Sequence, residues 1–98
     1  MKIIDKMIDA LDDEIEGAKK YAEKYIEWKS RGDSARASKY RDMANDELRH
    51  ASNIHDFAMM DIDGLKRVYT LPEKDAEKWL QAHRQFAEQY ALVKQMLS

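Results

Sequence analysis

The sequence contains no cysteine among its 98 residues. This excludes disulfide bonds, thiolate catalysis and metal sites that depend on cysteine, including iron–sulfur clusters. Any metal site must therefore be built from histidine and carboxylate side chains. That donor set suits iron, manganese or zinc better than copper(I).

Long apolar runs and basic blocks are also missing. No segment reaches about 18 consecutive apolar residues and no signal peptide begins the chain, so we expect a soluble, cytoplasmic protein that does not enter membranes. The 17 basic and 19 acidic residues give a net charge of −2, which argues against nucleic acid as the main partner. A chain of this length forms one domain, residues 1–98, and would gain stability from association, because it buries only about 60–65% of its unfolded surface.

Glycine and proline are scarce, and we expect Gly32, Gly64 and Pro72 to mark helix ends. The apolar periodicity between them predicts an all-α protein with helices over about residues 3–30, 34–61 and 72–97. The short connection around Gly32 predicts an antiparallel hairpin of the first two helices.

The connections contain residues suited to capping helices. Gly32 can adopt the left-handed conformation that follows a helix, and Asp33 can cap the second helix. Thr70 and Glu73 have the spacing of a capping box before the third helix. We therefore expect both later helices to begin with a side-chain cap.

One row of side chains on each hairpin helix, together called the seam, should face the other helix. Steps of three and four residues pass along the first helix through Ile4, Met7, Leu11, Glu14, Ala18, Tyr21, Tyr25 and Trp28. On the second helix they pass through Tyr40, Met43, Glu47, His50, Ile54 and Phe57. Glu14, Glu47 and His50 are the exceptions in rows of aliphatic, small and aromatic residues.

The three polar seam residues should meet at one height in the hairpin. Glu14 precedes Gly32 by as many residues as His50 follows it. Glu47 and His50 form a Glu-x-x-His pair on one helix face, about 4.5 Å apart along the axis. Glu16, by contrast, points about 200° away from Glu14 and joins the solvated face.

Buried carboxylates without a partner cost several kcal/mol each, and no lysine or arginine lies on the seam. A divalent metal ion is the simplest compensation, because carboxylate and neutral imidazole are the ligands it needs. A two-fold homodimer that pairs two hairpins into a four-helix bundle would double the set to two Glu14, two Glu47 and two His50. Di-iron carboxylate bundles use this combination.

These residues also resemble the ferritin-like superfamily. DDEIEGAKKY (12–21) is similar to the first-helix ligand motif, in which the ligand Glu precedes a Tyr by seven residues, here Glu14 and Tyr21. NDELRHA (45–51) is similar to the second-helix motif, with Glu47 as bridging carboxylate and His50 as nitrogen ligand. The resemblance covers about 60 residues, the span of two helices in a four-helix bundle.

No second Glu-x-x-His follows, since Glu77-x-x-Leu80 and Glu88-x-x-Ala91 lack the histidine. The chain therefore looks most like the encapsulated ferritins, short half-ferritin chains that assemble a di-iron site between two subunits. That resemblance implies a ferroxidase that oxidises iron(II) with oxygen, holding two irons per dimer, with an encapsulin shell as partner. The family's C-terminal targeting extension is not seen after VKQMLS (93–98).

Two alternatives remain open from the residues. One is a structural helical dimer with a polar interior layer, in which Glu14 and His50 pair directly as carboxylate and imidazolium. The other is a manganese- or zinc-binding bundle without oxidase activity. On the same seam, Tyr21 and Tyr25 lie near enough to assist the site, although aromatic packing explains both.

The third helix carries an apolar stripe that should close the hairpin core or dock on another subunit. Its members are Ala76, Trp79, Leu80, Phe86, Tyr90, Val93 and Leu97. His83 lies within the range of this stripe without an acidic partner, so we interpret it as an edge residue. His55 is about 140° from His50 around the helix and should not share its metal.

Overall fold

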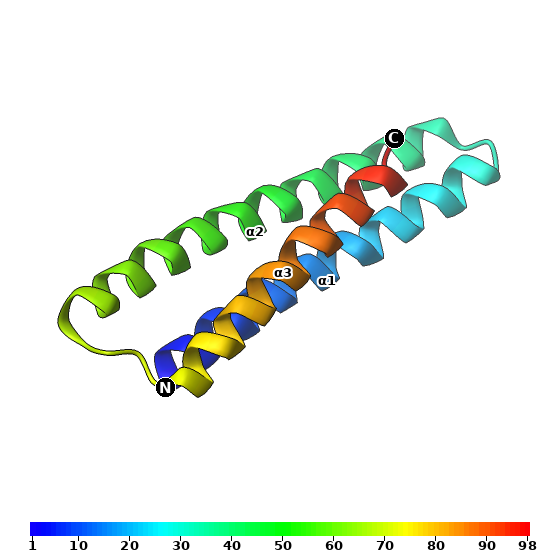
Figure 1. Cartoon of the computed structure of the whole chain (residues 1–98). Helices are drawn as coiled ribbons and strands as arrows, with labels where there is room; N and C mark the ends of the chain where they lie inside the picture. The colour runs from blue at the N-terminus through cyan, green and yellow to red at the C-terminus, as the bar shows by residue number, and fades with distance from the viewer.

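A computed structural model describes residues 1–98 as three helices without strands, which confirms the all-α prediction. The helices are α1 (Lys2–Ser30), α2 (Ser34–Val68) and α3 (Glu73–Met96). α1 and α2 form a long antiparallel hairpin, and α3 runs back beside α1 from the end where the chain begins (Figure 1). The molecule is a rod of 54 × 19 × 17 Å. None of its helices combines the length and the apolar character that crossing a membrane requires.

The turn between α1 and α2 has the predicted chemistry. Gly32 has a φ of +79°, the left-handed conformation that glycine adopts without steric cost. Asp33 caps α2 by accepting a hydrogen bond from the backbone N–H of Arg36 at 3.0 Å. Both residues therefore set the hairpin's antiparallel geometry.

The predicted end of α2 near residue 61 is wrong, because the helix continues through Gly64 to Val68. Ala58 and Ile62 are 2% and 1% exposed, so the buried stripe of α2 extends past the expected boundary. Burial of this stripe offsets the roughly 1 kcal/mol that a helical glycine costs. Lys66 and Arg67 in the last turn also interact favourably with the helix dipole.

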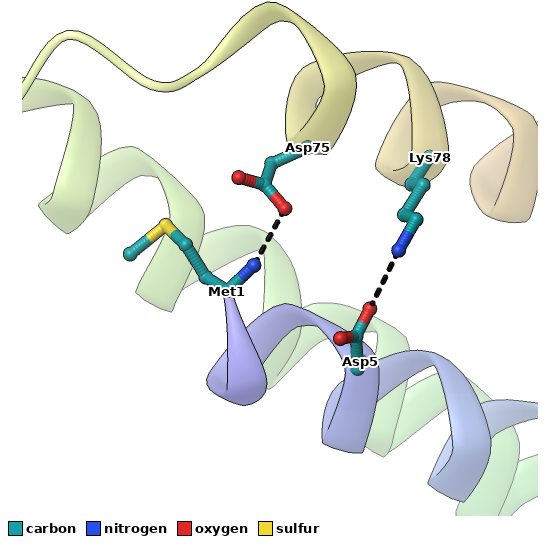
Figure 2. Close-up of polar contacts among 4 residues, drawn as sticks. All are labelled: Met1, Asp5, Asp75 and Lys78. Atoms are coloured by element: carbon teal, nitrogen blue, oxygen red, sulfur yellow. Dashed lines mark hydrogen bonds and ion pairs between the residues drawn. The ribbon is translucent and has the colours of Figure 1, made fainter.

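The capping box predicted for α3 is absent. Pro72 occupies the N-cap position, and no side chain there makes a capping hydrogen bond. The start of α3 is instead held by ionic contacts with the start of α1 (Figure 2). Asp75 accepts a hydrogen bond from the Met1 amino group at 2.6 Å, and Lys78 pairs with Asp5 at 3.3 Å.

On α2 the core is displaced by about one residue from the predicted seam, whereas on α1 the predicted seam is buried at alternate positions, namely Ile4, Leu11, Ala18 and Tyr25. The buried residues that form its larger cluster are Leu11, Ile15, Ala18, Ala22, Tyr25, Ala37, Ala44, Leu48, Ala51, Val93 and Leu97. Seam residues such as Met43 and Phe57 remain 40% and 64% exposed. The displacement arises because α3 packs on one side of the hairpin and draws the buried centre toward itself.

The predicted stripe of α3 closes this core in part. Trp79, Val93 and Leu97 are 7%, 0% and 3% exposed, and Phe86 and Tyr90 pack against the larger cluster. Leu80 lies on the outer surface with 47% of its area exposed. α3 therefore serves as the third wall of a small bundle.

Candidate metal centre

Glu14, Glu47 and His50 meet near the middle of the hairpin, as the sequence predicts. One ligand atom from each side chain lies within 4.8 Å of the other two. Glu14 comes from α1, while Glu47 and His50 are one turn apart on α2. The antiparallel register set by the turn at Gly32 brings the two helices together at this height.

The cluster lies at the edge of the α1–α2 interface that is remote from α3. Lys19, which lines the groove between α1 and α3, is roughly 140° around α1 from Glu14, at 100° per residue. The side chains of Glu14 and His50 are 28% and 52% exposed. The prediction that these side chains are buried in the seam is therefore wrong for the single chain, because the core is centred on the neighbouring Ile15, Leu48 and Ala51.

One oxygen in the cluster is nevertheless fully buried and lacks a hydrogen-bond donor. Oε2 of Glu14 has no hydrogen-bond partner. Nδ1 of His50 lies 3.8 Å from this oxygen, which is too long for a hydrogen bond. A buried carboxylate oxygen without a donor is costly, and no lysine or arginine forms an ion pair with Glu14 or Glu47.

The two carboxylates act directly on each other. When both are ionised, neither offers a hydrogen for the other to accept, whereas a proton on Glu47 supplies a donor to Glu14. This hydrogen bond is the largest cause that raises the pKa of Glu47 above its usual value, followed by burial and by repulsion from Glu14. His50 opposes the rise. The pair therefore favours a positive charge between its oxygens, either a proton or a metal ion.

Gly17, which the seam pattern did not identify, also contributes to the site. It lies one turn after Glu14 on α1, and a Cβ atom there would come within 3.3 Å of Oε2 of Glu47. The absence of a side chain on Gly17 thus leaves room for the Glu47 carboxylate. A glycine in the middle of a long helix, where it costs roughly 1 kcal/mol, was the available signal.

The predicted supporting tyrosines have packing roles. Tyr21 pairs with Tyr40 across the hairpin, with ring centroids 6.3 Å apart. Tyr25 is 9% exposed and belongs to the hydrophobic core. The structure gives neither residue a hydrogen bond to Glu14, Glu47 or His50.

His55 and His83, the second of which we interpreted as an edge residue, contact each other. Nε2 of His55 lies 2.6 Å from Nδ1 of His83, on the side of α2 that faces α3. As predicted, His55 does not join the cluster around His50. The contact was not visible in the sequence because it depends on how α3 packs against α2.

Two carboxylates and one imidazole fit a divalent cation by their chemistry. They provide oxygen and nitrogen donors and an unpartnered buried oxygen, and they leave one side open to solvent. Three side chains alone do not complete the coordination of a hexacoordinate ion. No family model, curated protein or solved structure matches this chain.

Proposed function

We propose that this protein binds divalent iron at Glu14, Glu47 and His50 and oxidises it with oxygen, using a site completed by a second copy of the chain. The observation that carries the proposal is the unpartnered Oε2 of Glu14 within a cluster of three ligand side chains. A cation would offset the cost of this oxygen and the repulsion between the Glu14 and Glu47 carboxylates. Iron is favoured over manganese or zinc by the resemblance of 12–21 and 45–51 to ferritin-like ligand motifs.

A second copy is supported by the apolar surface that flanks the cluster. Met43, His50 and Phe57 are seven residues apart in turn and therefore share one side of α2. Met43 and Phe57 are 40% and 64% exposed. A two-fold dimer that covers this side would bury both residues and place the two sets of ligands opposite each other. Two hairpins would then form a four-helix bundle.

Each ligand has a distinct role in the proposed site. Glu47 would be the residue that bridges two ions, as the resemblance of 45–51 to the second-helix ligand motif implies. Because the pKa of Glu47 is raised, protons compete with a cation for this carboxylate more strongly than for an ordinary glutamate, and acid weakens cation binding. Gly17 maintains the space that this carboxylate occupies.

Iron(II) and oxygen are the substrates of the proposed reaction. Two iron(II) ions give up one electron each, and these electrons with two protons reduce O₂ to hydrogen peroxide. The protein contributes the spacing of the ions and the negative charge that favours iron(III) over iron(II).

The polar-layer alternative is less well supported by the geometry. It requires Glu14 and His50 to pair directly, but their closest atoms are 3.8 Å apart and Oε2 of Glu14 remains without a donor. A structural pair at the centre of an interface would satisfy that oxygen.

Iron oxidation by Glu47→Ala and Glu16→Ala variants tests the proposal. Glu16 lies on the outer face of α1 with a side chain 67% exposed, so its substitution is a matched loss of one carboxylate. We expect Glu47→Ala to lose iron binding and oxidation while remaining helical, and Glu16→Ala to retain both. Wild-type protein that binds no iron, or equal activity in both variants, would contradict the proposal. Binding without oxidation would retain a metal site but remove the ferroxidase function.

A further inference from the structure

His55 and His83 form a shielded imidazole pair between α2 and α3. Nε2 of His55 and Nδ1 of His83 are 2.6 Å apart, and the side chain of His55 is only 14% exposed. The His55 ring stacks on Phe86 with centroids 4.5 Å apart and an interplanar angle of 14°. The centroid of the Trp79 ring lies 5.8 Å from the centroid of the His55 ring. His55 is thus enclosed by three aromatic side chains of α3.

The histidine pair differs in position from the other hydrogen bonds between α2 and α3. Two other hydrogen bonds join α2 to α3, from Arg41 to the Leu97 carbonyl at 3.0 Å and from Lys94 to Asn45 at 3.5 Å. Both lie at the C-terminal end of α3. The histidine pair is therefore the polar contact that fastens the N-terminal half of α3 to α2.

The number of protons on the pair decides whether the hydrogen bond can exist. Two neutral rings have one donor and one acceptor nitrogen at the contact, and a singly protonated pair can retain such an arrangement. When both rings are protonated, every ring nitrogen is a donor and two positive charges adjoin. The second proton therefore converts an attractive contact into a repulsive one.

Few charged groups near His55 and His83 stabilise the protonated form of the pair. Burial and the neighbouring His83 lower the pKa of His55, and Asp56 of α2 raises it to a smaller extent. Asp56 lies 3.8 Å from Nδ1 of His55, but its side chain is 77% exposed. From α1, Asp12 borders the groove beside Phe86, and burial followed by repulsion from Asp9 keeps the pKa of Asp12 raised. No buried carboxylate adjoins the pair to neutralise two protons.

We propose that the His55–His83 pair is a proton-sensitive latch that releases the N-terminal half of α3 from α2 when both rings become protonated. A metal site is a poorer interpretation, because two nitrogens without a third ligand side chain do not hold an ion firmly. The latch is independent of the Glu14, Glu47 and His50 cluster, which lies on the opposite side of the hairpin.

The sign of the pH dependence follows from the lowered pKa of His55. Around and below the ordinary histidine pKa, the unfolded or undocked ring binds protons that the docked ring excludes. The latch therefore contributes its full stabilisation above that value and loses it as the pH falls. Release is expected below about pH 6.5, the ordinary value for histidine.

The fluorescence of Trp79 reports the state of the latch. Trp79 is 7% exposed and lies against His55, while Trp28 is at the hairpin turn and can be replaced in a Trp28→Phe background. Acidification from about pH 7.5 to about pH 5 should move Trp79 emission to longer wavelength while far-UV circular dichroism stays helical. The change should reverse on neutralisation.

A His55→Phe variant provides the decisive comparison, because it keeps an aromatic ring against Phe86 and cannot take up a proton. We expect the pH-dependent shift of Trp79 to be lost in His55→Phe and retained in His50→Phe, which lacks the histidine of the other cluster. An unchanged Trp79 spectrum in the Trp28→Phe protein across this range would overturn the proposal. An equal shift in His55→Phe would overturn it too, by attributing release to other groups. Should His55→Phe lose its helical circular dichroism, His83→Phe provides the same comparison.

Discussion

At the scale of single residues, the most informative atom is Oε2 of Glu14, which is buried without a donor. A buried oxygen without a donor destabilises the folded chain, and a bound cation offsets this cost most directly. Its partners could be identified from the sequence because Glu14, Glu47 and His50 interrupt apolar rows at positions that the hairpin aligns. Periodicity and chain register alone carried that part of the prediction.

Gly17 was not predictable in the same way. Its importance depends on the 3.3 Å between an added Cβ atom and the Glu47 carboxylate, a distance set by how closely α1 and α2 approach. Residue spacing does not contain that information. The same holds for His55 and His83, whose contact depends on the packing of α3.

Substitution of Gly17 by alanine should affect helix stability and iron binding in opposite directions. Alanine is more favourable than glycine in a helix by about 1 kcal/mol, but at position 17 it crowds the Glu47 carboxylate. We expect Gly17→Ala to weaken iron(II) binding by roughly tenfold, as for other residues that support metal ligands, without unfolding the protein. Anaerobic titration with iron(II) measures the change.

Gly64→Ala is the matched control for this substitution. Gly64 is also helical, and an added Cβ atom there would meet nothing within 4 Å. The free energy of unfolding of the Gly64→Ala variant should exceed that of the wild type by about 1 kcal/mol, and its iron binding should be unchanged. Equal iron affinity in the two alanine variants would exclude the proposed role of Gly17.

At the scale of the elements, the helices were predicted closely where local chemistry determines their ends and poorly where tertiary packing does. Gly32 and Asp33 act through their own backbone and side chain, so the turn between α1 and α2 follows from sequence. The end of α2 depends instead on the burial of Ile62 beyond the expected stop. A single exposed glycine, Gly64, does not end a helix whose buried face continues.

Ile62→Ala tests this explanation for the length of α2. Ile62 is 1% exposed, and truncating a buried isoleucine to alanine destabilises proteins by about 2–5 kcal/mol. We expect a loss of that size in the free energy of unfolding, with faster amide hydrogen exchange concentrated over residues 63–68. Met60→Ala, at a side chain 67% exposed, should change stability by less than about 0.5 kcal/mol. Uniform exchange along α2 in the Ile62 variant would refute the explanation.

At the scale of the whole molecule, the single chain presents a cluster of three ligand side chains and exposed apolar residues on one side of α2. The exposed Met43 and Phe57 flank His50 on α2, and the three-residue cluster opens toward the same surface. A symmetric dimer would account for both features, because a second copy would cover the exposed apolar residues and supply further ligands. The core of the chain itself is closed on the other side by α3.

Phe57→Glu should separate the proposed dimer while leaving each chain helical. A carboxylate at this 64% exposed position costs the single chain little, but it would be buried in the proposed interface without a partner. Sedimentation should show monomers for Phe57→Glu and dimers for the wild type. Leu80→Glu, at a 47% exposed position on α3, should remain dimeric. Dimers of equal stability in both variants would place the interface elsewhere.

The stoichiometry of iron binding by the metal-free protein tests the shared site most directly. Titration with iron(II) under anaerobic conditions should saturate near one ion per chain, or two per dimer, as expected for a di-iron site built from two Glu-x-x-His helices. Admission of oxygen should then oxidise the bound iron rapidly. Absence of iron binding at Glu14, Glu47 and His50 would contradict the account.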